Sequence, residues 1–148
     1  MGFFMLMQEL AWERMLVAII CQAGAEAAFA HTVQYTKDRK AFGKPVAAFQ
    51  NTRFKLAELR TEIDFCLAYL DRCMELQLEK SLGIDAAAAA KYKISDMFSK
   101  VVDECLQLHG GYGYMMEYPI ARAYIDNRAN RIYAGTNEIM KELISRTL

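Results

Sequence analysis

Proline is scarce in this sequence, where only Pro45 and Pro119 interrupt 148 residues. The stretches around them are rich in Ala, Leu, Met, Glu, Lys and Gln, which are good helix formers. No segment shows the strict alternation of apolar and polar residues that predicts a half-buried strand. Hydrophobic residues make up 54% of the chain, which is a globular composition. The sequence therefore predicts an all-α fold, an antiparallel up-and-down helical bundle.

Net charge is absent too, because 18 basic residues balance 18 acidic ones. A neutral chain has no overall field that attracts nucleic acid, and we expect no nucleic-acid partner. Within residues 36–60, however, basic residues clearly outnumber the acidic ones, Asp38 and Glu58. Such a stretch could bind a phosphate-bearing small molecule, or it could be a solvated helix end.

Paired cysteine motifs are missing. The four cysteines are Cys21, Cys66, Cys73 and Cys105, and no two of them form a C-x-x-C pair. The two histidines, His31 and His109, do not stand at the spacing from the cysteines or from each other that zinc ligands have, so we expect no metal site. Each cysteine falls inside a helical pattern, where a reduced thiol packs like a small apolar residue. The cysteines are therefore interpreted as core thiols in a reducing compartment.

No signal peptide or membrane span is expected. Residues 3–7 are apolar, but no basic segment precedes them. The longer apolar run at residues 15–30 contains Gln22 and Glu26, and it is shorter than the roughly 20 residues that a bilayer requires. These features favour a soluble protein.

Helices are expected over residues 10–38, 48–80, 84–108, 119–130 and 136–146, with a short connection at 40–46. The first is apolar on almost every side as far as Ala30, which predicts burial on every side. Gly24 within it would let a neighbouring helix come close. In the second, apolar residues repeat every seven positions, as in helix bundles. Its two parallel rows are Phe49, Leu56, Ile63, Leu70 and Thr52, Leu59, Cys66, Cys73.

The third helix places its apolar residues on one face. They are Ala90, Ile94, Met97, Phe98, Val101, Val102, Cys105 and Leu108. Gly110 and Gly111 then end the helix. Pro119 suits the first turn of the fourth helix, and Thr136 can cap the last one. Glu138 in that last helix suits the positive end of the helix dipole.

Three segments carry more specific information. Residues 35–45 with Phe49 and Gln50 resemble the acyl-CoA dehydrogenase pattern R-x-x-F-G followed by Q. Residues 107–114 resemble the Q-x-x-G-G-x-G segment of that family, and residues 132–139 resemble its Y-x-G-T-x-E-I segment. All three stand in the order and spacing of the family. The resemblance covers nearly the whole chain and is greatest to the long-chain branch, judging by residues 2–9 and 140–144.

The resemblance implies FAD as cofactor. Family members remove an α-proton and a β-hydride from an acyl-CoA thioester, and FAD accepts the hydride. The residues that match contacts to the FAD of a neighbouring subunit are Arg39, Phe42, Gln50, Gln107, Gly110 and Gly111. Thr136 and Glu138 match positions near the chain's own FAD. Physically, Arg39 offers a forked donor for pyrophosphate and the glycines allow close backbone approach. Alternatively, Arg39 only complements a helix end and the glycines are only caps.

The catalytic base departs from the commoner family pattern. Many members carry a glutamate in Y-E-G-T, where this sequence has Ala134, which cannot ionise. Either catalysis has been lost, or the base lies elsewhere. The segment at residues 12–16 resembles that of the long-chain and isovaleryl branches, which implies Glu13 as the base and Arg14 as a contact to the CoA moiety. Tyr133 and Gly135, in the matched segment, are the further substrate contacts expected.

Family members also have an N-terminal helical domain and a middle β-domain. By resemblance, residues 1–9 are a linker from that middle domain and residues 10–148 the C-terminal domain. We therefore expect no activity from the chain alone. The partners implied are acyl-CoA, further copies in a dimer or tetramer, and an electron-transfer flavoprotein, in the bacterial cytoplasm or mitochondrial matrix. The alternatives are a non-catalytic assembly module and a related flavoenzyme, an oxidase or a nitroalkane enzyme.

Overall fold

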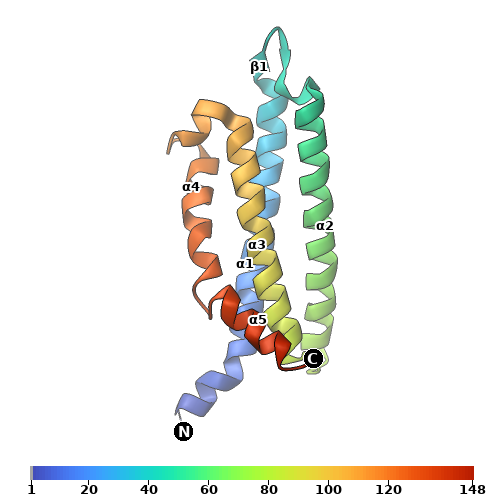
Figure 1. Cartoon of the computed structure of the whole chain (residues 1–148), viewed down its shortest axis with the longest axis vertical. Coiled ribbons are helices and arrows are strands. Elements are labelled where there is room, and N and C mark those ends of the chain that lie inside the picture. The colour runs from blue at the N-terminus through green and yellow to red at the C-terminus, as the bar shows by residue number, and fades with distance from the viewer. Residues whose placement is uncertain (1) are drawn as a thin grey trace.

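The computed structural model describes the backbone of residues 2–148 and the side chains from Glu9 onward. Over this range the helices are α1 (Gly2–Asp38), α2 (Gln50–Leu78), α3 (Ile84–His109), α4 (Pro119–Asn127) and α5 (Asn137–Ser145). The three long helices run up, down and up, and the short α4 runs back down beside them (Figure 1). The predicted antiparallel helical bundle is therefore confirmed. The roles expected for residues 1–9 lie largely outside the described side chains and stay predictions.

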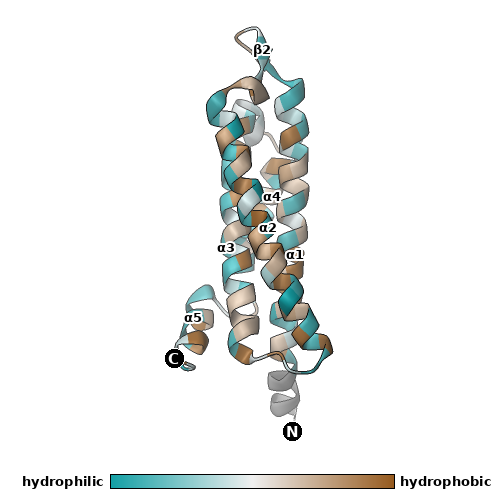
Figure 2. Cartoon of the chain, turned by 90° about the vertical axis from the view of Figure 1, so that its right-hand side faces the viewer, coloured by the Kyte–Doolittle hydropathy of each residue, from teal (hydrophilic) through white to brown (hydrophobic). Residues whose placement is uncertain are grey.

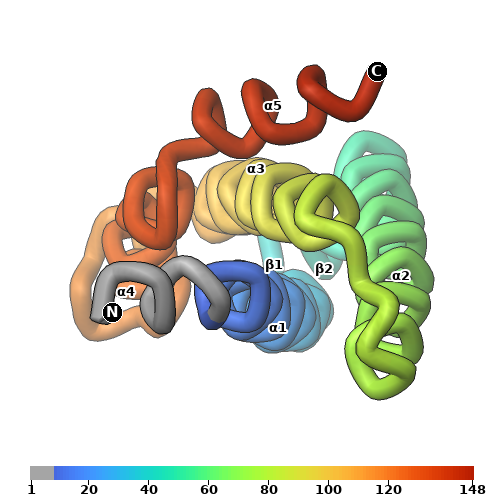
Figure 3. The backbone as a smooth tube through the Cα atoms, turned by 90° about the horizontal axis from the view of Figure 1, so that it is seen from below, coloured from blue at the N-terminus to red at the C-terminus, as the bar shows by residue number. Residues whose placement is uncertain are grey.

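Helix α3 lies at the centre of the bundle and contacts α1, α2, α4 and α5 (Figure 3). The apolar face predicted for it is confirmed, because every residue named above is buried except Leu108, which is half-buried. Helix α2 packs with the two predicted rows inward, including Leu59, Ile63, Cys66 and Leu70. All four cysteines are buried and reduced, as predicted. One core between α1, α2 and α3 thus holds the domain together.

Helix α1 is not buried on every side within this chain, which corrects the prediction. Met15 and Cys21 are fully buried, but Leu16 and Ile20 are 41% and 57% exposed. Seen along the bundle, α3 lies above α1, α4 to its left and α2 to its right, and no helix of the described residues covers the remaining side of α1 (Figure 3). Residues Glu9–Asp38 are long and apolar enough to cross a bilayer, a criterion that the core helix of a water-soluble bundle also meets. Coloured by hydropathy, short apolar and polar stretches follow one another along α1 and α2 (Figure 2).

The connection after α1 is a small β-hairpin, although no strand was expected. Strands β1 (Lys40–Ala41) and β2 (Lys44–Pro45) pair antiparallel. Phe42 and Gly43 at the tip both have positive φ, 51° and 81°, which is the backbone of a tight hairpin turn. A short 3-10 turn at Val46–Ala48 follows, and extended Phe49 delays the start of α2 to Gln50. Two-residue strands are too short to leave a periodic pattern in the sequence.

The remaining helix ends follow the predicted signals. Gly110 ends α3 with φ of 59°, a conformation that glycine adopts without strain. Pro119 occupies the first turn of α4. The side chain of Thr136 accepts a hydrogen bond from the backbone N–H of Ile139 and so caps α5. Between α4 and α5, a 3-10 turn at Arg128–Arg131 leads into residues 132–136, a segment that we call the 132–136 turn.

Candidate functional site

The predicted site residues form two groups at opposite ends of the bundle. The hairpin end carries Arg39, Phe42, Gln50, Gln107, Gly110 and Gly111. The other end, where α5 lies, carries Arg14, the 132–136 turn and Glu138 (Figure 1). Along α1, the rise from Glu13 to Arg39 is about 39 Å at about 1.5 Å per residue. The sequence pattern thus builds two separate sites, which we call the hairpin-end site and the α5-end site.

A cavity of about 480 Å³ lies at the hairpin end and brings together Arg39, Gln107, Gly110 and Gly111. Neither glycine has an atom within 4 Å of the place where a Cβ would stand, so their backbone is accessible to a ligand. Phe42, which is 97% exposed at the hairpin tip, and Gln50 do not line this cavity. The predicted group therefore divides into four residues that share a cavity and two that lie outside it.

Arg39 supplies the positive charge of this cavity. Its guanidinium lies 5.2 Å from the ring centre of Tyr112, and this cation–π contact orients it. Among the described side chains, no carboxylate forms an ion pair with Arg39. A guanidinium without a carboxylate partner is suited to a bound phosphate or pyrophosphate.

His109 lines this cavity, and the sequence reasoning missed it as a site residue. Its ring stacks on Tyr35 at 4.0 Å between ring centres, and its Nδ1 lies 2.8 Å from the carbonyl oxygen of Cys105. That carbonyl requires a proton on Nδ1, which leaves Nε2 as a buried acceptor with no partner in the part of the chain whose side chains are described. Burial lowers the pKa of His109. The only sequence signal was its place directly before the two glycines.

At the α5 end, Glu13 and Arg14 have different environments. Glu13 is exposed on the surface of α1, whereas Arg14 is only 8% exposed. Burial lowers the pKa of the Arg14 guanidinium, and the neighbouring Glu13 carboxylate partly offsets this. Arg14 Nε is buried and has no hydrogen-bond partner among the described side chains. A buried donor without a hydrogen bond costs free energy of folding. Such a donor is suited to bind an acceptor on a ligand.

The 132–136 turn has an unusual backbone. Ala134 and Gly135 follow one another in the left-handed region, with φ of 56° and 94°. Tyr133 donates its hydroxyl to Oδ1 of Asn130 at 2.5 Å. The exposed Glu138 has a lowered pKa because its own backbone N–H and the Thr136 hydroxyl bond its carboxylate. The structure therefore brings together the predicted residues Tyr133, Gly135, Thr136 and Glu138 within one short segment.

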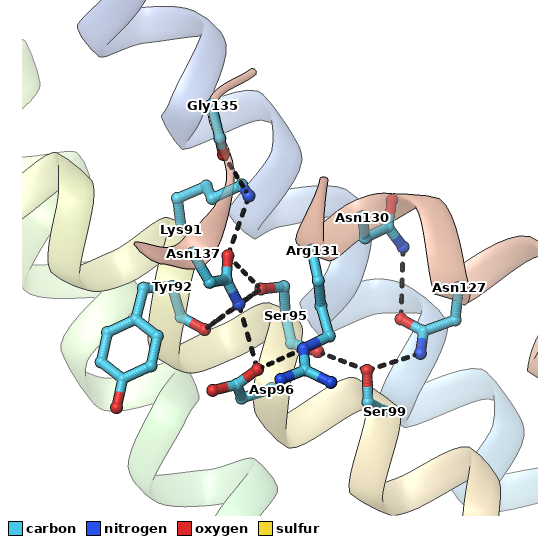
Figure 4. Close-up of polar contacts among 10 residues, drawn as sticks. All are labelled: Lys91, Tyr92, Ser95, Asp96, Ser99, Asn127, Asn130, Arg131, Gly135 and Asn137. Carbon is cyan, nitrogen blue, oxygen red and sulfur yellow. Dashed lines mark hydrogen bonds and ion pairs between the residues drawn. The ribbon is translucent and has the colours of Figure 1, made fainter. Parts of the chain in front are cut away.

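A buried polar cluster fixes this turn to α3, and the sequence reasoning missed it. Lys91 Nζ donates to the Gly135 carbonyl at 2.8 Å and to Asn137 Oδ1 at 2.9 Å (Figure 4). Asn137 Nδ2 donates in turn to Ser95 Oγ at 2.9 Å and to Asp96 Oδ1 at 3.0 Å. The signal available was a lysine and a serine four residues apart on the apolar face of a helix.

The family model described as "Acyl-CoA dehydrogenase, C-terminal domain" matches residues 1–148. The mitochondrial long-chain specific acyl-CoA dehydrogenase of Sus scrofa is 52% identical over 147 residues, which are 99% of this chain and 34% of that protein. The short-chain specific acyl-CoA dehydrogenase of Megasphaera elsdenii is 42% identical over 140 residues, 93% of this chain and 36% of that protein.

Solved structures agree with the sequence relatives. The acyl-CoA dehydrogenase of Geobacillus kaustophilus superposes with a TM-score of 0.96 at 47% identity, and the match covers 98% of this chain and 38% of that one. The butyryl-CoA dehydrogenase of Megasphaera elsdenii gives a TM-score of 0.95 at 37% identity, over 99% of this chain and 38% of that one. This chain thus spans little more than a third of the length of the relatives it matches.

Proposed function

Because the chain belongs to the acyl-CoA dehydrogenase family and matches its C-terminal domain throughout, we propose that it is the C-terminal domain of a flavin-dependent acyl-CoA dehydrogenase. The reaction removes an α-proton and a β-hydride from an acyl-CoA thioester. A bound FAD supplies the acceptor for the hydride. This domain contributes the base, contacts to the cofactor, and surfaces that pack against other copies.

The hairpin-end site is suited to the pyrophosphate part of FAD. Arg39 has no carboxylate partner among the described side chains, and it shares a cavity with the accessible backbone of Gly110 and Gly111. Gln107 in the same cavity adds an amide that can both donate and accept. Phe42 and Gln50 would contact the cofactor only where a neighbouring chain covers the hairpin.

The separation of the two sites supports two different FAD molecules for each domain. Arg39 lies about 39 Å along α1 from Glu13. One flavin dinucleotide cannot reach the hairpin-end cavity and also present its reactive ring beside Glu13, Thr136 and Glu138. The α5-end site would therefore serve the FAD of the same chain, and the hairpin-end site would serve the FAD of a second copy. This is the single observation that most strongly supports a homo-oligomer, a dimer or a tetramer.

We propose Glu13 as the catalytic base, since Ala134 has no ionisable group. An exposed carboxylate on α1 is accessible to an acyl chain bound over it, as a general base must be. Arg14 Nε is a buried donor that is available for the CoA moiety. Tyr133 and Gly135, on the facing turn, would contact the thioester.

The test uses the whole flavin-loaded enzyme. The DNA upstream of the Met1 codon is therefore sequenced first, to find whether the open reading frame continues there. Glu13→Gln keeps the size of the side chain but cannot accept the α-proton. We expect the rate of flavin bleaching by saturating acyl-CoA to fall about 10²–10⁴-fold. Glu9→Gln is the matched control, because it removes an exposed glutamate one turn earlier on the same helix and should leave the rate unchanged. Bleaching at the wild-type rate in Glu13→Gln would exclude Glu13 as the base.

A non-catalytic assembly module is the second candidate, and the exposed apolar residues Leu16 and Ile20 on α1 favour it. Under that reading the chain assembles but no acyl-CoA is oxidised. A closed frame upstream of Met1, together with stable self-association, would favour it over the dehydrogenase. For the dehydrogenase, resemblance indicates an electron-transfer flavoprotein as acceptor, in bacterial cytoplasm or mitochondrial matrix.

A further inference from the structure

Lys91 is a lysine with no solvent exposure, and from Glu9 onward it is the largest fully buried side chain. It lies on the inner face of α3 between Ala90 and Ile94, where the apolar pattern of the helix would favour a methionine or leucine. Burial lowers the pKa of its ammonium, because moving a charge out of water is costly. A lysine kept at such a position needs an explanation beyond packing.

The two acceptors of Lys91 both belong to the segment that follows α4. Its ammonium donates to the backbone carbonyl of Gly135 and to the side chain of Asn137, across 44 and 46 residues of sequence (Figure 4). Asn137 is itself only 1% exposed, and Ser95 Oγ bonds it from the next turn of α3. One lysine thereby joins the central helix to the turn and to the start of α5.

The backbone of this turn needs an external support. Ala134 has φ of 56°, in a region that residues with a Cβ rarely adopt, and Gly135 follows with φ of 94°. A backbone of this kind persists only where surrounding contacts hold it. Within the turn, Ile132 and Tyr133 bond back to Ala129, but the backbone–backbone bonds found across the described residues include none to the carbonyl of Gly135. The Lys91 ammonium takes that place.

A second polar contact limits where the turn can move. Asp96, one helical turn after Tyr92 on α3, accepts from Asn137 Nδ2 and pairs with Arg131 Nε at 2.6 Å. Arg131 stands directly before the turn and Asn137 directly after it. Both ends of the turn are therefore held on α3 through Asp96, and its middle is held through Lys91 (Figure 4).

We propose that Lys91 is a positioning residue, which holds the Gly135 carbonyl and Asn137 and thereby sets how the 132–136 turn faces the substrate. The role rests on the proposed function, because that turn carries Tyr133 and Gly135. Lys91 itself touches neither substrate nor cofactor. It acts through the turn, opposite the base on α1.

The first test measures hydrogen exchange by mass spectrometry on the 148-residue chain, in the segment 132–140. Lys91→Met keeps the length and apolar stem of the side chain but removes the donor. We expect the exchange of this segment to speed up at least about tenfold, because two hydrogen bonds from a charged group are lost. Val101→Ala is the matched control, since Val101 is equally buried on α3, about 15 Å further along, and its truncation weakens the core generally. An equal increase in both variants would overturn the proposal.

A second variant covers the case in which Lys91→Met does not fold. Ser95→Ala removes only the hydroxyl that bonds Asn137 and leaves Lys91 in place. We expect the same segment to exchange faster by a smaller factor, about threefold. Unchanged exchange in Ser95→Ala, or an increase spread evenly over the whole chain, would count against a cluster that specifically holds this turn.

The second test measures flavin bleaching in the whole flavin-loaded enzyme. Lys91→Met should lower the rate at saturating acyl-CoA at least about tenfold with FAD content unchanged, while Val101→Ala stays within about twofold. Faster exchange without slower bleaching would show that Lys91 holds the turn but has no role in the reaction, which overturns the proposal. If the wild-type enzyme does not bleach at all, the proposed function fails, and the exchange measurement still decides whether Lys91 holds the turn.

Discussion

Gly24 on α1 packs against the ring of Phe98 on α3, and Gly24→Ala tests that packing. A Cβ added at Gly24 would stand 2.6 Å from Cζ and 2.8 Å from Cε1 of Phe98 on α3. Real Cβ atoms essentially never come so close to another heavy atom. Phe98 is only 6% exposed, so its ring cannot swing into solvent without leaving the core.

Two opposing effects determine the outcome. In the middle of a helix, alanine is more favourable than glycine by about 1 kcal/mol. Overpacking a well-filled core costs about 1–3 kcal/mol. Because the contact is with a buried aromatic ring, we expect the packing cost to exceed the helix gain. Gly24→Ala should then lower the free energy of unfolding by up to about 2 kcal/mol.

The measurement is urea unfolding followed by helical circular dichroism. Phe98→Leu removes the ring atoms that the new methyl group meets, and on its own it should destabilise by about 1–2 kcal/mol through the space it leaves. In the double variant the methyl group enters that space, so the two changes should cost at least about 1 kcal/mol less than their sum. If Gly24→Ala alone stabilises the domain by the full helix gain of about 1 kcal/mol, the close packing of α1 on Phe98 is wrong.

Two further predictions concern the site ends. Burial lowers the pKa of His109 in the folded domain, so between that lowered pKa and the unfolded value of about 6.5 only the unfolded chain binds the proton. The free energy of unfolding should therefore fall as the pH drops below about 7, by at most about 1.4 kcal/mol per pH unit. In urea unfolding measured from pH 7.5 to 5, His109→Phe should remove the share of this pH dependence that His109 contributes. An unchanged pH dependence in the variant would contradict the reasoning. Thr136→Ala removes the cap of α5 and should cost about 1 kcal/mol in the same assay, whereas Thr136→Ser keeps the hydroxyl and should cost less; equal losses would exclude the cap as the cause.

The sequence predicted most of the helical framework because its signals are local. The heptad rows of α2, the apolar face of α3, Pro119 and the cap at Thr136 each depend on residues a few positions apart. The exposed face of α1 could not be predicted, because an apolar pattern does not tell how many neighbours a helix has within one chain. The hairpin at residues 40–45 was missed because strands of two residues carry no period.

The candidate site divides in the same way. Arg39, Gln107, Gly110 and Gly111 could be named from their motifs, and the structure brings them to one cavity. Lys91 and Asn137 could not be paired, because they lie 46 positions apart and Lys91 belongs to no motif. Contacts between distant residues depend on how helices dock, which helix-forming patterns alone do not specify.

The length of α1 has a consequence for how this domain can vary. The helix spans about seven turns from Glu13 to Arg39, so under the proposed function its length sets the distance and the rotation between one chain's reaction centre and the cofactor of another. A single residue inserted between Glu13 and Arg39 would turn one site about 100° relative to the other and move it about 1.5 Å. Substitutions on the outer face of α1 leave the rotation of one site relative to the other unchanged. An insertion or deletion that is not a whole number of helical turns changes that rotation. Variation in this helix should therefore be a matter of side chains and not of length.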